Sequence, residues 1–396
     1  MYSSRCSIAI KALLFVALFG FTSINITTKV MANSDIITDS EEKRTRTDVI
    51  TDPRVLELIF MIGHTTIAYD GDELAFIALD PRDSKVVYAA TKAGALYKSV
   101  NGGKKWRHVN NKFDMTRHGN LAIDPNDTTI MYANAFMIDD DENIGGIMKS
   151  TNSGLDWNLL MELKDFRNHK VSIVIDPNNS STVYVGSRSG RIYKSTDAGL
   201  NWKTILDNID DIGSSYAPIL DISHTKPSIL YAGVWDRNSN RILKSIDNGQ
   251  TWININNGMD NGVSFVAIAV SQHDSNTVYA LFSNCLYKST NAGESWRELK
   301  KSPYEKYGTL HRGILLTTDP SIIYLNTTRG LYRSANGGES WGKTQRYEKD
   351  NNIDADFIAV HPKNHRIIYA GNYKRLYKST NSGRTWKTIL RHPVKF

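Results

Sequence analysis

One eight-residue motif occurs seven times in this chain, and its repetition limits the fold more than any other feature. Each copy begins with Ser, has Asn or Asp in the third position and Gly in the fifth, and ends with Trp. We call these copies boxes, and they span Ser99–Trp106, Ser150–Trp157, Ser195–Trp202, Ser245–Trp252, Ser289–Trp296, Ser334–Trp341 and Ser379–Trp386. Successive box serines are 51, 45, 50, 44, 45 and 45 residues apart, so the chain is a tandem array of one structural unit.

Each unit contains four short apolar runs of the kind that form β-strands. In the first unit the runs begin at Phe76, surround Tyr88, cover Leu96–Lys98 and follow Trp106. The second run of every unit carries a Tyr: Tyr88, Tyr132, Tyr184, Tyr231, Tyr279, Tyr324 and Tyr369. Four strands per repeat predict an all-β fold, a seven-bladed β-propeller of four-stranded antiparallel blades. We expect every unit to supply its own four strands, so that the ring closes without strand exchange.

The box is expected to be a tight turn between the third and fourth strands. The Asn or Asp side chain can accept hydrogen bonds from the turn's own backbone. The Gly can take a positive φ, and the Trp ring can fill space beside the next blade. A basic residue precedes each box, and we interpret this set as protection of the sheet edge: Lys98, Lys149, Lys194, Lys244, Lys288, Arg333 and Lys378. The boxes are therefore structural and are not expected to be catalytic or to bind metal.

The N-terminal part of the chain differs from the repeats. Residues 1–32 combine basic Arg5 and Lys11 with an apolar run from Ala12 to about Phe21, which is typical of a signal peptide cleaved after Ala32. An uncleaved membrane anchor is the alternative, although the run is short for a bilayer span. Residues 33–54 are polar and predict a flexible linker, and 55–396 form the propeller domain, beginning with an apolar stretch at 55–68. We expect a secreted, periplasmic or cell-surface protein.

Charge and cysteine content exclude several classes of function. Loss of Arg5, Lys11 and Lys29 with the signal peptide lowers the formal net charge from +7 to +4, which does not indicate a nucleic-acid partner. Cys285 is then the remaining cysteine and is expected to be buried and inert. The sequence has no metal, phosphate-loop or nucleophile motif, so we predict no cofactor. An acidic run at Asp139–Asn143 departs from the calcium-loop pattern and is expected to be solvated.

The boxes resemble the Asp-box, or BNR, consensus of a β-propeller superfamily, and the resemblance covers about residues 75–390. This superfamily includes sialidases, xyloglucan-cleaving glycosidases, sortilin-type receptors and the photosystem II assembly and stability factors. A single seven-bladed propeller behind a signal peptide is most similar in build to the assembly factors. The chain lacks the Arg-Ile-Pro motif of sialidases and the second propeller of xyloglucanases. Asp-boxes recur across all these families, so they indicate fold and not activity.

Basic and aromatic residues gather in the loops expected on the face opposite the boxes. We predict that these residues form a partner-binding surface at the mouth of the channel: Arg117, His118, Arg167, His169, Tyr216, Trp235, Tyr307, His311, Arg312, Tyr373 and Arg375. The resulting hypothesis is a non-catalytic, monomeric scaffold that binds a protein, with a glycan as the other ligand class.

A glycoside hydrolase is the alternative. It would need two carboxylates at a set separation, and the same face is expected to hold several acids: Asp165, Asp210, Asp211, Asp260, Asp354 and Asp356. The sequence does not show which of them lie close together, so we assign no catalytic residue and no metal ligand.

Overall fold

The computed structural model describes residues of the propeller domain between 73 and 391. The chain divides into two units, Met1–Ile67 and Ala68–Phe396, and every described residue belongs to the second. The described ranges are 73–92, 94–109, 113–115, 120–137, 144–163, 171–187, 190–207, 218–235, 240–259, 265–299, 311–328, 330–344 and 355–391. The predicted signal peptide, the linker and the apolar stretch at 55–68 lie outside these residues.

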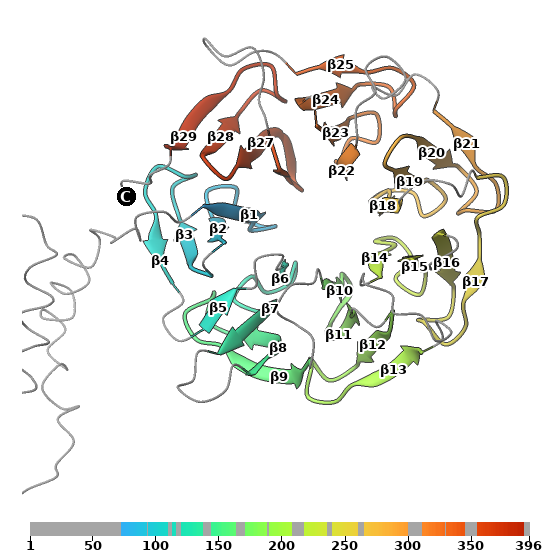
Figure 1. Cartoon of the computed structure of the whole chain (residues 1–396), viewed down its shortest axis with the longest axis horizontal. Coiled ribbons are helices and arrows are strands. Elements are labelled where there is room, and N and C mark those ends of the chain that lie inside the picture. Colours follow the sequence, from blue (N-terminus) through green and yellow to red (C-terminus); the bar gives the residue numbers. More distant parts are fainter. Residues whose placement is uncertain are drawn as a thin grey trace, which may run out of the picture. The chain divides into compact units, whose positions relative to one another are not determined.

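Seven antiparallel sheets surround a central axis (Figure 1), which confirms the predicted fold. Blade 1 consists of β1 (Leu74–Leu79), β2 (Val87–Thr91), β3 (Leu96–Ser99) and β4 (Arg107–His108). Blade 2 consists of β5 (Phe113–Met115), β6 (Leu121–Ile123), β7 (Met131–Met137), β8 (Ile144–Ser150) and β9 (Asn158–Glu162). Blade 3 consists of β10 (Ser172–Asp176), β11 (Asn179–Gly186), β12 (Ile192–Ser195) and β13 (Lys203–Leu206).

The remaining blades repeat the same order. Blade 4 consists of β14 (Ile219–Ile222), β15 (Leu230–Trp235), β16 (Asn240–Ser245) and β17 (Ile253–Asn254). Blade 5 consists of β18 (Phe265–Val270), β19 (Val278–Phe282), β20 (Leu286–Ser289) and β21 (Arg297–Glu298). Blade 6 consists of β22 (His311–Leu316), β23 (Ile323–Thr327), β24 (Gly330–Ser334) and β25 (Gly342–Lys343), and blade 7 of β26 (Phe357–His361), β27 (Asn364–Asn372), β28 (Arg375–Ser379) and β29 (Lys387–Arg391).

Each blade is built from consecutive strands, so among the described strands the ring closes without strand exchange, as predicted. Blade 2 adds one feature that the repeat did not predict. Its long strand β7 pairs with both β6 and β5, which makes this sheet five-stranded. Blades 7 and 1 meet by packing, in an apolar cluster that includes Leu74, Tyr97 and Trp106 from blade 1 with Tyr369 and Leu390 from blade 7.

The boxes are tight turns held by their own side chains. In the third box the Ser195 hydroxyl donates to Asp197 Oδ1 at 2.8 Å and accepts the Gly199 amide at 2.8 Å, and Asp197 Oδ1 accepts the Asn201 amide at 2.8 Å. Asn or Asp in the other boxes makes the same bonds. The fourth residue donates its amide to the turn between the first two strands of its blade, as Ala198 does to the Ser181 carbonyl at 2.8 Å. Both turns therefore share one face, which we call the box face, and we call the opposite face the loop face.

The blades are joined by a repeated clasp between a Tyr, a Lys and the next box. Tyr132 Oη and Lys149 Nζ of blade 2 both donate to the Ala198 carbonyl of the third box, at 3.1 and 3.0 Å. The Tyr279 and Lys288 side chains reach the Gly337 carbonyl in the same way, at 3.1 and 3.2 Å. The interpretation as edge protection is therefore wrong for Lys149, Lys194, Lys288 and Lys378, because each donates to a box carbonyl of the next blade.

The box Trp residues are less uniform than expected. Trp106 and Trp386 are buried, whereas the other five box tryptophans are half-buried. The indole N–H of Trp106 donates to the Gly103 carbonyl of its own box at 3.1 Å, and that of Trp296 donates to the Ile255 carbonyl of the preceding blade at 2.7 Å. Cys285 is buried in the cluster between blades 4 and 5, as predicted.

The box Gly also makes room for the neighbouring blade, which yields a stability prediction. Gly249 has φ +86°, and a Cβ there would collide with Ile205 Cδ1 of the preceding blade. Gly258 has a nearly equal φ of +84° but meets nothing within 4 Å. Gly258→Ala should lower the free energy of unfolding by about 1 kcal/mol through backbone strain. Gly249→Ala should cost about 1–3 kcal/mol more through overpacking. Chemical denaturation measures both, and equal losses would contradict this role of the glycine.

Candidate binding site

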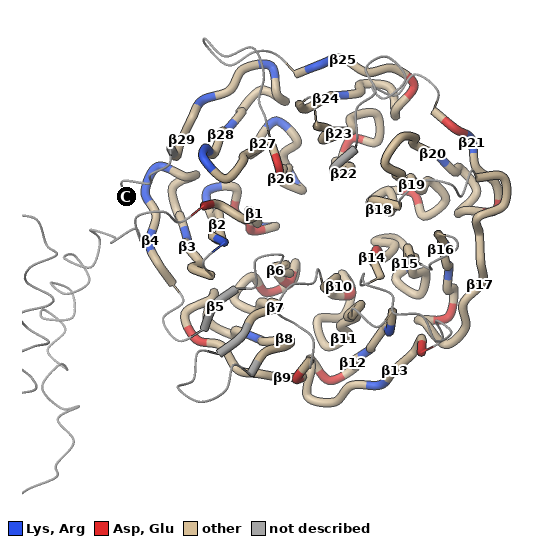
Figure 2. The backbone as a smooth tube through the Cα atoms, in the orientation of Figure 1, with Lys and Arg blue, Asp and Glu red and all other residues tan. Residues whose placement is uncertain are grey.

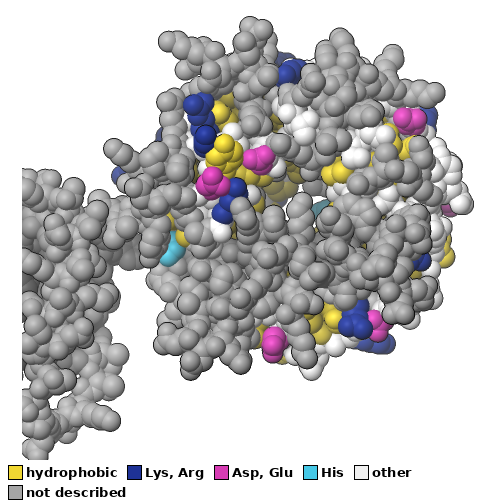
Figure 3. Space-filling view, in the orientation of Figure 1, with side chains coloured by type: hydrophobic (Ala, Val, Ile, Leu, Met, Phe, Trp, Pro, Cys, Tyr) yellow, Lys and Arg dark blue, Asp and Glu magenta, His cyan; other side chains and the backbone are white. Residues whose placement is uncertain are grey.

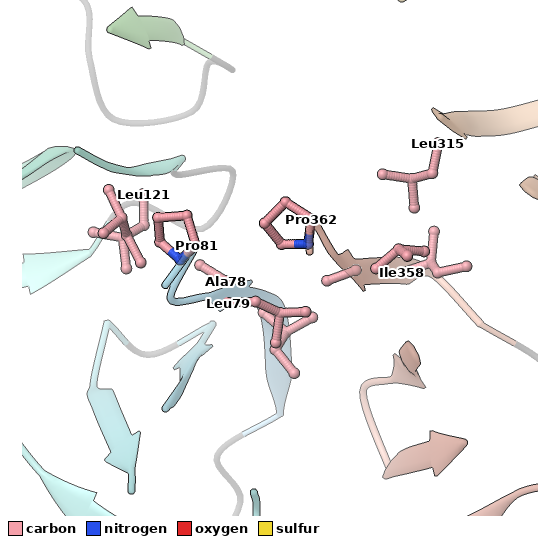
Figure 4. Close-up of a pocket in the computed structure, with 11 residues that line it drawn as sticks. Ala78, Leu79, Pro81, Leu121, Leu315, Ile358 and Pro362 are labelled. Carbon is pink, nitrogen blue, oxygen red and sulfur yellow. The ribbon is translucent and has the colours of Figure 1, made fainter. Parts of the chain in front are cut away.

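The central channel is apolar near the box-face ends of the inner strands. A cavity of about 310 Å³ is lined by residues of four blades (Figure 4): Ile77, Ala78, Leu79, Pro81, Leu121, Ile123, Leu315, Ile358, Ala359, Val360 and Pro362. It lies toward the box face because Pro81 and Pro362 follow the ends of β1 and β26, where the box-face turns begin. This lining of described residues provides contacts for an apolar group.

One acid occupies a position of the inner strands that is apolar in the six other blades. Seven residues of these strands pair directly with the second-strand Tyr of their blades, and six are apolar: Ala78, Ala122, Val174, Ala269, Leu315 and Ala359. The seventh is Asp221. Its Oδ2 accepts the Val270 amide of blade 5 at 2.7 Å, and its Oδ1 accepts the Ile222 amide at 2.8 Å. Asp221 therefore connects the inner strands of blades 4 and 5.

Burial changes the acidity of this carboxyl group. Desolvation raises the pKa of Asp221 to about 6, and the two backbone hydrogen bonds offset only part of this rise. Glycoside hydrolysis would use a pair of carboxyl groups. Because both oxygens of Asp221 accept backbone N–H groups, the role that this geometry supports is structural connection.

A basic and aromatic cluster lies on the loop face where blade 7 meets blade 1. The Tyr373 carbonyl accepts the Leu74 amide at 3.3 Å across the interface. Lys92 Nζ and Lys374 Nζ lie 5.3 and 5.0 Å from the centroid of the Tyr373 ring, within the range of a cation–π interaction. Lys92 Nζ also pairs with Glu73 Oε2 at 2.5 Å. Arg375 follows directly, its amide donating to Asn372 Oδ1 at 2.9 Å.

The surrounding sector carries an excess of positive charge. Residues 355–391 of blade 7 contain eight Lys or Arg residues and one acid, Asp356. The described residues of blade 1 contain seven Lys or Arg and three acids, whereas those of blade 2 contain one Lys and five acids. Figure 2 shows basic positions along β27, β28 and β29, and the space-filling view shows charged and apolar side chains exposed side by side in this sector (Figure 3).

The predicted site residues are only partly covered by the structure. Six of them lie outside the described residues: Arg117, His118, Arg167, His169, Tyr216 and Tyr307. Trp235 is the last residue of β15, and His311 and Arg312 begin β22, but their side chains are not described. Tyr373 and Arg375 are described, and the fold brings them together at one turn, between β27 and β28.

Sequence reasoning missed the two lysines beside the Tyr373 ring, Lys92 and Lys374, and Glu73, which pairs with Lys92. Lys374 could have been predicted from the sequence, because it lies between the predicted residues Tyr373 and Arg375. Glu73 and Lys92 belong to blade 1, about 280 residues earlier, and only closure of the ring places them there. Sequence reasoning also missed Asp221, although an acid within an otherwise apolar strand, Ile219–Ile222, can be recognised in the sequence.

The acids considered for catalysis are mostly outside the described ranges. Of the six, only Asp356 is described, and its amide donates to the Gly371 carbonyl at 2.7 Å. The acidic run at Asp139–Asn143 is also outside the described ranges, and it lies between β7 and β8. Within the described ranges, no group of three or more His, Cys, Asp or Glu side chains is arranged to hold a metal ion. The same residues include no helix long and apolar enough to cross a membrane.

Comparison with known proteins relates this propeller to two groups. No family model matches the chain. Xyloglucanase Xgh74A of Acetivibrio thermocellus is 23% identical over 235 residues, which cover 51% of this chain but only 28% of that protein. The GH74 xyloglucanase from Xanthomonas campestris has a TM-score of 0.65 at 17% identity, covering 83% of this chain and 55% of that one. YCF48 bound to D1 peptide has a TM-score of 0.55 at 14% identity, covering 79% of this chain and 93% of that one.

These matches establish a seven-bladed propeller related to the GH74 xyloglucanases and sharing its fold with YCF48. The chain spans just over a quarter of the curated xyloglucanase that it matches. It corresponds to nearly the whole of YCF48 in length.

The raised pKa of Asp221 predicts a distinctive dependence of stability on pH. Because the folded pKa of about 6 exceeds the unfolded value of 3.8, ionisation is less favourable in the folded state. Stability should therefore fall as pH rises through this window, by up to about 3 kcal/mol. Asp221→Asn should remove that fall. Asp197→Asn serves as the control, because hydrogen bonds lower the pKa of Asp197 to about 2 and place its effect below the window. Urea denaturation between pH 4 and 7 tests this, and parallel curves for parent and Asp221→Asn would contradict it.

Proposed function

We propose that this protein is an exported, non-catalytic scaffold that binds an acidic segment of a protein partner through its loop face. The observation that carries the proposal is the cluster around Tyr373, where Lys92, Lys374 and Arg375 meet at the junction of blades 7 and 1. Arg and Tyr are favoured at the energetic centres of protein interfaces. The basic excess of the two blades would attract an acidic partner and orient it.

The loop face suits a specific partner better than the regular box face. Seven similar boxes cannot by themselves define one orientation, whereas the loop-face cluster occurs at one junction. The predicted residues Arg117, His118, Arg167, His169, Tyr216, Trp235, Tyr307, His311 and Arg312 would extend this surface toward other blades. The complex of YCF48 with D1 peptide supports the view that one propeller of this size can bind a peptide. A role in assembly or stabilisation of the partner would follow from that likeness.

A glycoside hydrolase remains the second candidate because of the sequence similarity to xyloglucanase Xgh74A. The test is turnover of xyloglucan and related β-glucans by the purified protein. Activity that is abolished by Asn substitution at Asp165, Asp210, Asp211, Asp260, Asp354 or Asp356 would favour this candidate over the scaffold.

Charge removal on the two faces distinguishes the proposed binding surface. The variant Lys92→Gln/Lys374→Gln/Arg375→Gln should weaken binding of a partner purified from the native host by on the order of tenfold, with the difference shrinking at high salt. The matched control is Lys85→Gln/Lys226→Gln/Lys363→Gln, which removes three exposed charges from box-face turns. Both should melt near the parent temperature, because these side chains lie at the surface. Loss of binding in the control alone would place the partner on the box face.

A further inference from the structure

Among the described residues, large apolar side chains are exposed at one set of turns only. Five are exposed among the described residues: Val100 (64%), Leu155 (47%), Leu200 (75%), Ile246 (64%) and Ile253 (58%). Four lie within boxes and Ile253 directly follows one. They belong to blades 1, 2, 3 and 4, which are consecutive in the ring. We call these five side chains the apolar tips.

The turn itself does not require these residues. At the second position of the box, where Val100 and Ile246 stand, the other boxes have Thr151, Thr196, Thr290, Ala335 and Thr380. At the sixth position, where Leu155 and Leu200 stand, the others have Lys104, Gln250, Glu294, Glu339 and Arg384. The residue after the Trp, Ile253 in blade 4, is Arg107, Asn158, Lys203, Arg297, Gly342 or Lys387 elsewhere. The apolar tips are therefore additions to the turn and not part of its construction.

The boxes hold these tips in place on a common face. Each box is closed by side-chain hydrogen bonds such as Gly199 amide to Ser195 Oγ at 2.8 Å and Gly249 amide to Ser245 Oγ at 2.8 Å. A clasp from the preceding blade fixes the turn further, as Lys194 Nζ does at the Asn248 carbonyl at 3.2 Å. The tips thus remain exposed while their backbone is rigid.

The distribution of the tips favours a lipid surface over a protein pocket. Protein hot spots are contiguous, desolvated clusters, whereas these tips are spread over four blades of the ring. Separate apolar groups on one face can each enter the boundary between headgroups and acyl chains. Basic groups accompany them: Lys104 and Lys105 are exposed in the first box, and Lys203 is exposed beside the third. Such groups attract anionic headgroups.

The far side of the ring has the opposite character. Glu294 and Glu339 occupy the sixth box position in blades 5 and 6, and Glu339 pairs with Arg297. Beside the apolar tips, the exposed acid Asp156 accepts a hydrogen bond from Asn152 Nδ2 at 2.7 Å. Because the apolar tips belong to blades 1–4 and the acids Glu294 and Glu339 to blades 5 and 6, the box face of blades 1–4 would contact a membrane while blades 5 and 6 tilt away from it.

We propose that the box turns of blades 1–4 seat this propeller on an anionic lipid surface, with Val100, Leu155, Leu200, Ile246 and Ile253 entering the interface. The loop face would then point away from the membrane, toward a partner. This inference rests on the exposure of the box face and is independent of the proposed loop-face function.

Vesicle flotation of the exported protein tests the proposal. It should bind vesicles of phosphatidylcholine mixed with phosphatidylglycerol, and bind phosphatidylcholine alone more weakly. The variant Leu200→Gln/Ile246→Thr/Ile253→Lys uses residues found at the same positions in sibling blades, so the fold should persist. It should bind the mixed vesicles roughly tenfold less. The control Glu294→Gln/Glu339→Gln should bind at least as well as the parent.

An environment-sensitive dye locates the contact directly and separates it from any N-terminal anchor. Attached at Leu200→Cys, it should shift to the blue on mixed vesicles, and attached at Glu294→Cys it should not; Cys285 is buried and should remain unlabelled. Equal binding of the triple variant and the parent would overturn the proposal. So would a parent dimer seen by light scattering that the triple variant abolishes, because the tips would then belong to an interface between two copies.

Discussion

The structure depends on one kind of contact at six of the seven blade junctions: a box carbonyl accepts a hydrogen bond from the Tyr, the Lys or both of the preceding blade. The fourth box residue has a positive φ even where it is not Gly, as at Ala198 (φ 60°) and Asn248 (φ 59°). This conformation is uncommon for such residues, and the Ser and Asp or Asn hydrogen bonds of the turn hold it in place. The turn thereby presents its carbonyl to the neighbouring blade, so the local geometry of the box becomes the joint between blades.

A partly buried Lys ammonium in such a joint loses part of its hydration. The acids that offset this loss differ from blade to blade. Burial lowers the pKa of Lys149 and Lys194, while Asp124 and Asp176 of the same blades act to raise it. For Lys288 the opposing charge is Glu339 of the next box. At the closing junction, Lys378 donates to the Gly102 carbonyl at 3.0 Å, and burial followed by the neighbouring Lys104 lowers its pKa. The ring is therefore closed where positive charge is most concentrated, and the same junction carries the cluster around Tyr373.

The candidate surfaces of this protein are departures from the repeat. Seven similar boxes build the ring, but by themselves they offer a partner no unique feature. The candidate surfaces arise where one blade differs from its siblings: Tyr373 beside Lys374 in blade 7, and the apolar tips of blades 1–4. Each departure is supported by the same scaffold, so binding residues can vary while the joints stay constant.

The sequence alone determined the number of blades, the four repeated strands of each and the closure without exchange, because these follow from a local turn motif and its spacing; it did not predict the fifth strand, β5, of blade 2. It also identified Tyr373 and Arg375 as surface candidates and Cys285 as buried. Only the tertiary structure revealed that four of the lysines before the boxes are interblade donors, since a side chain's direction depends on its neighbour blade. Closure of the ring likewise decided that Glu73 and Lys92 join Tyr373, because contacts between the two ends of an array leave no local trace in the sequence.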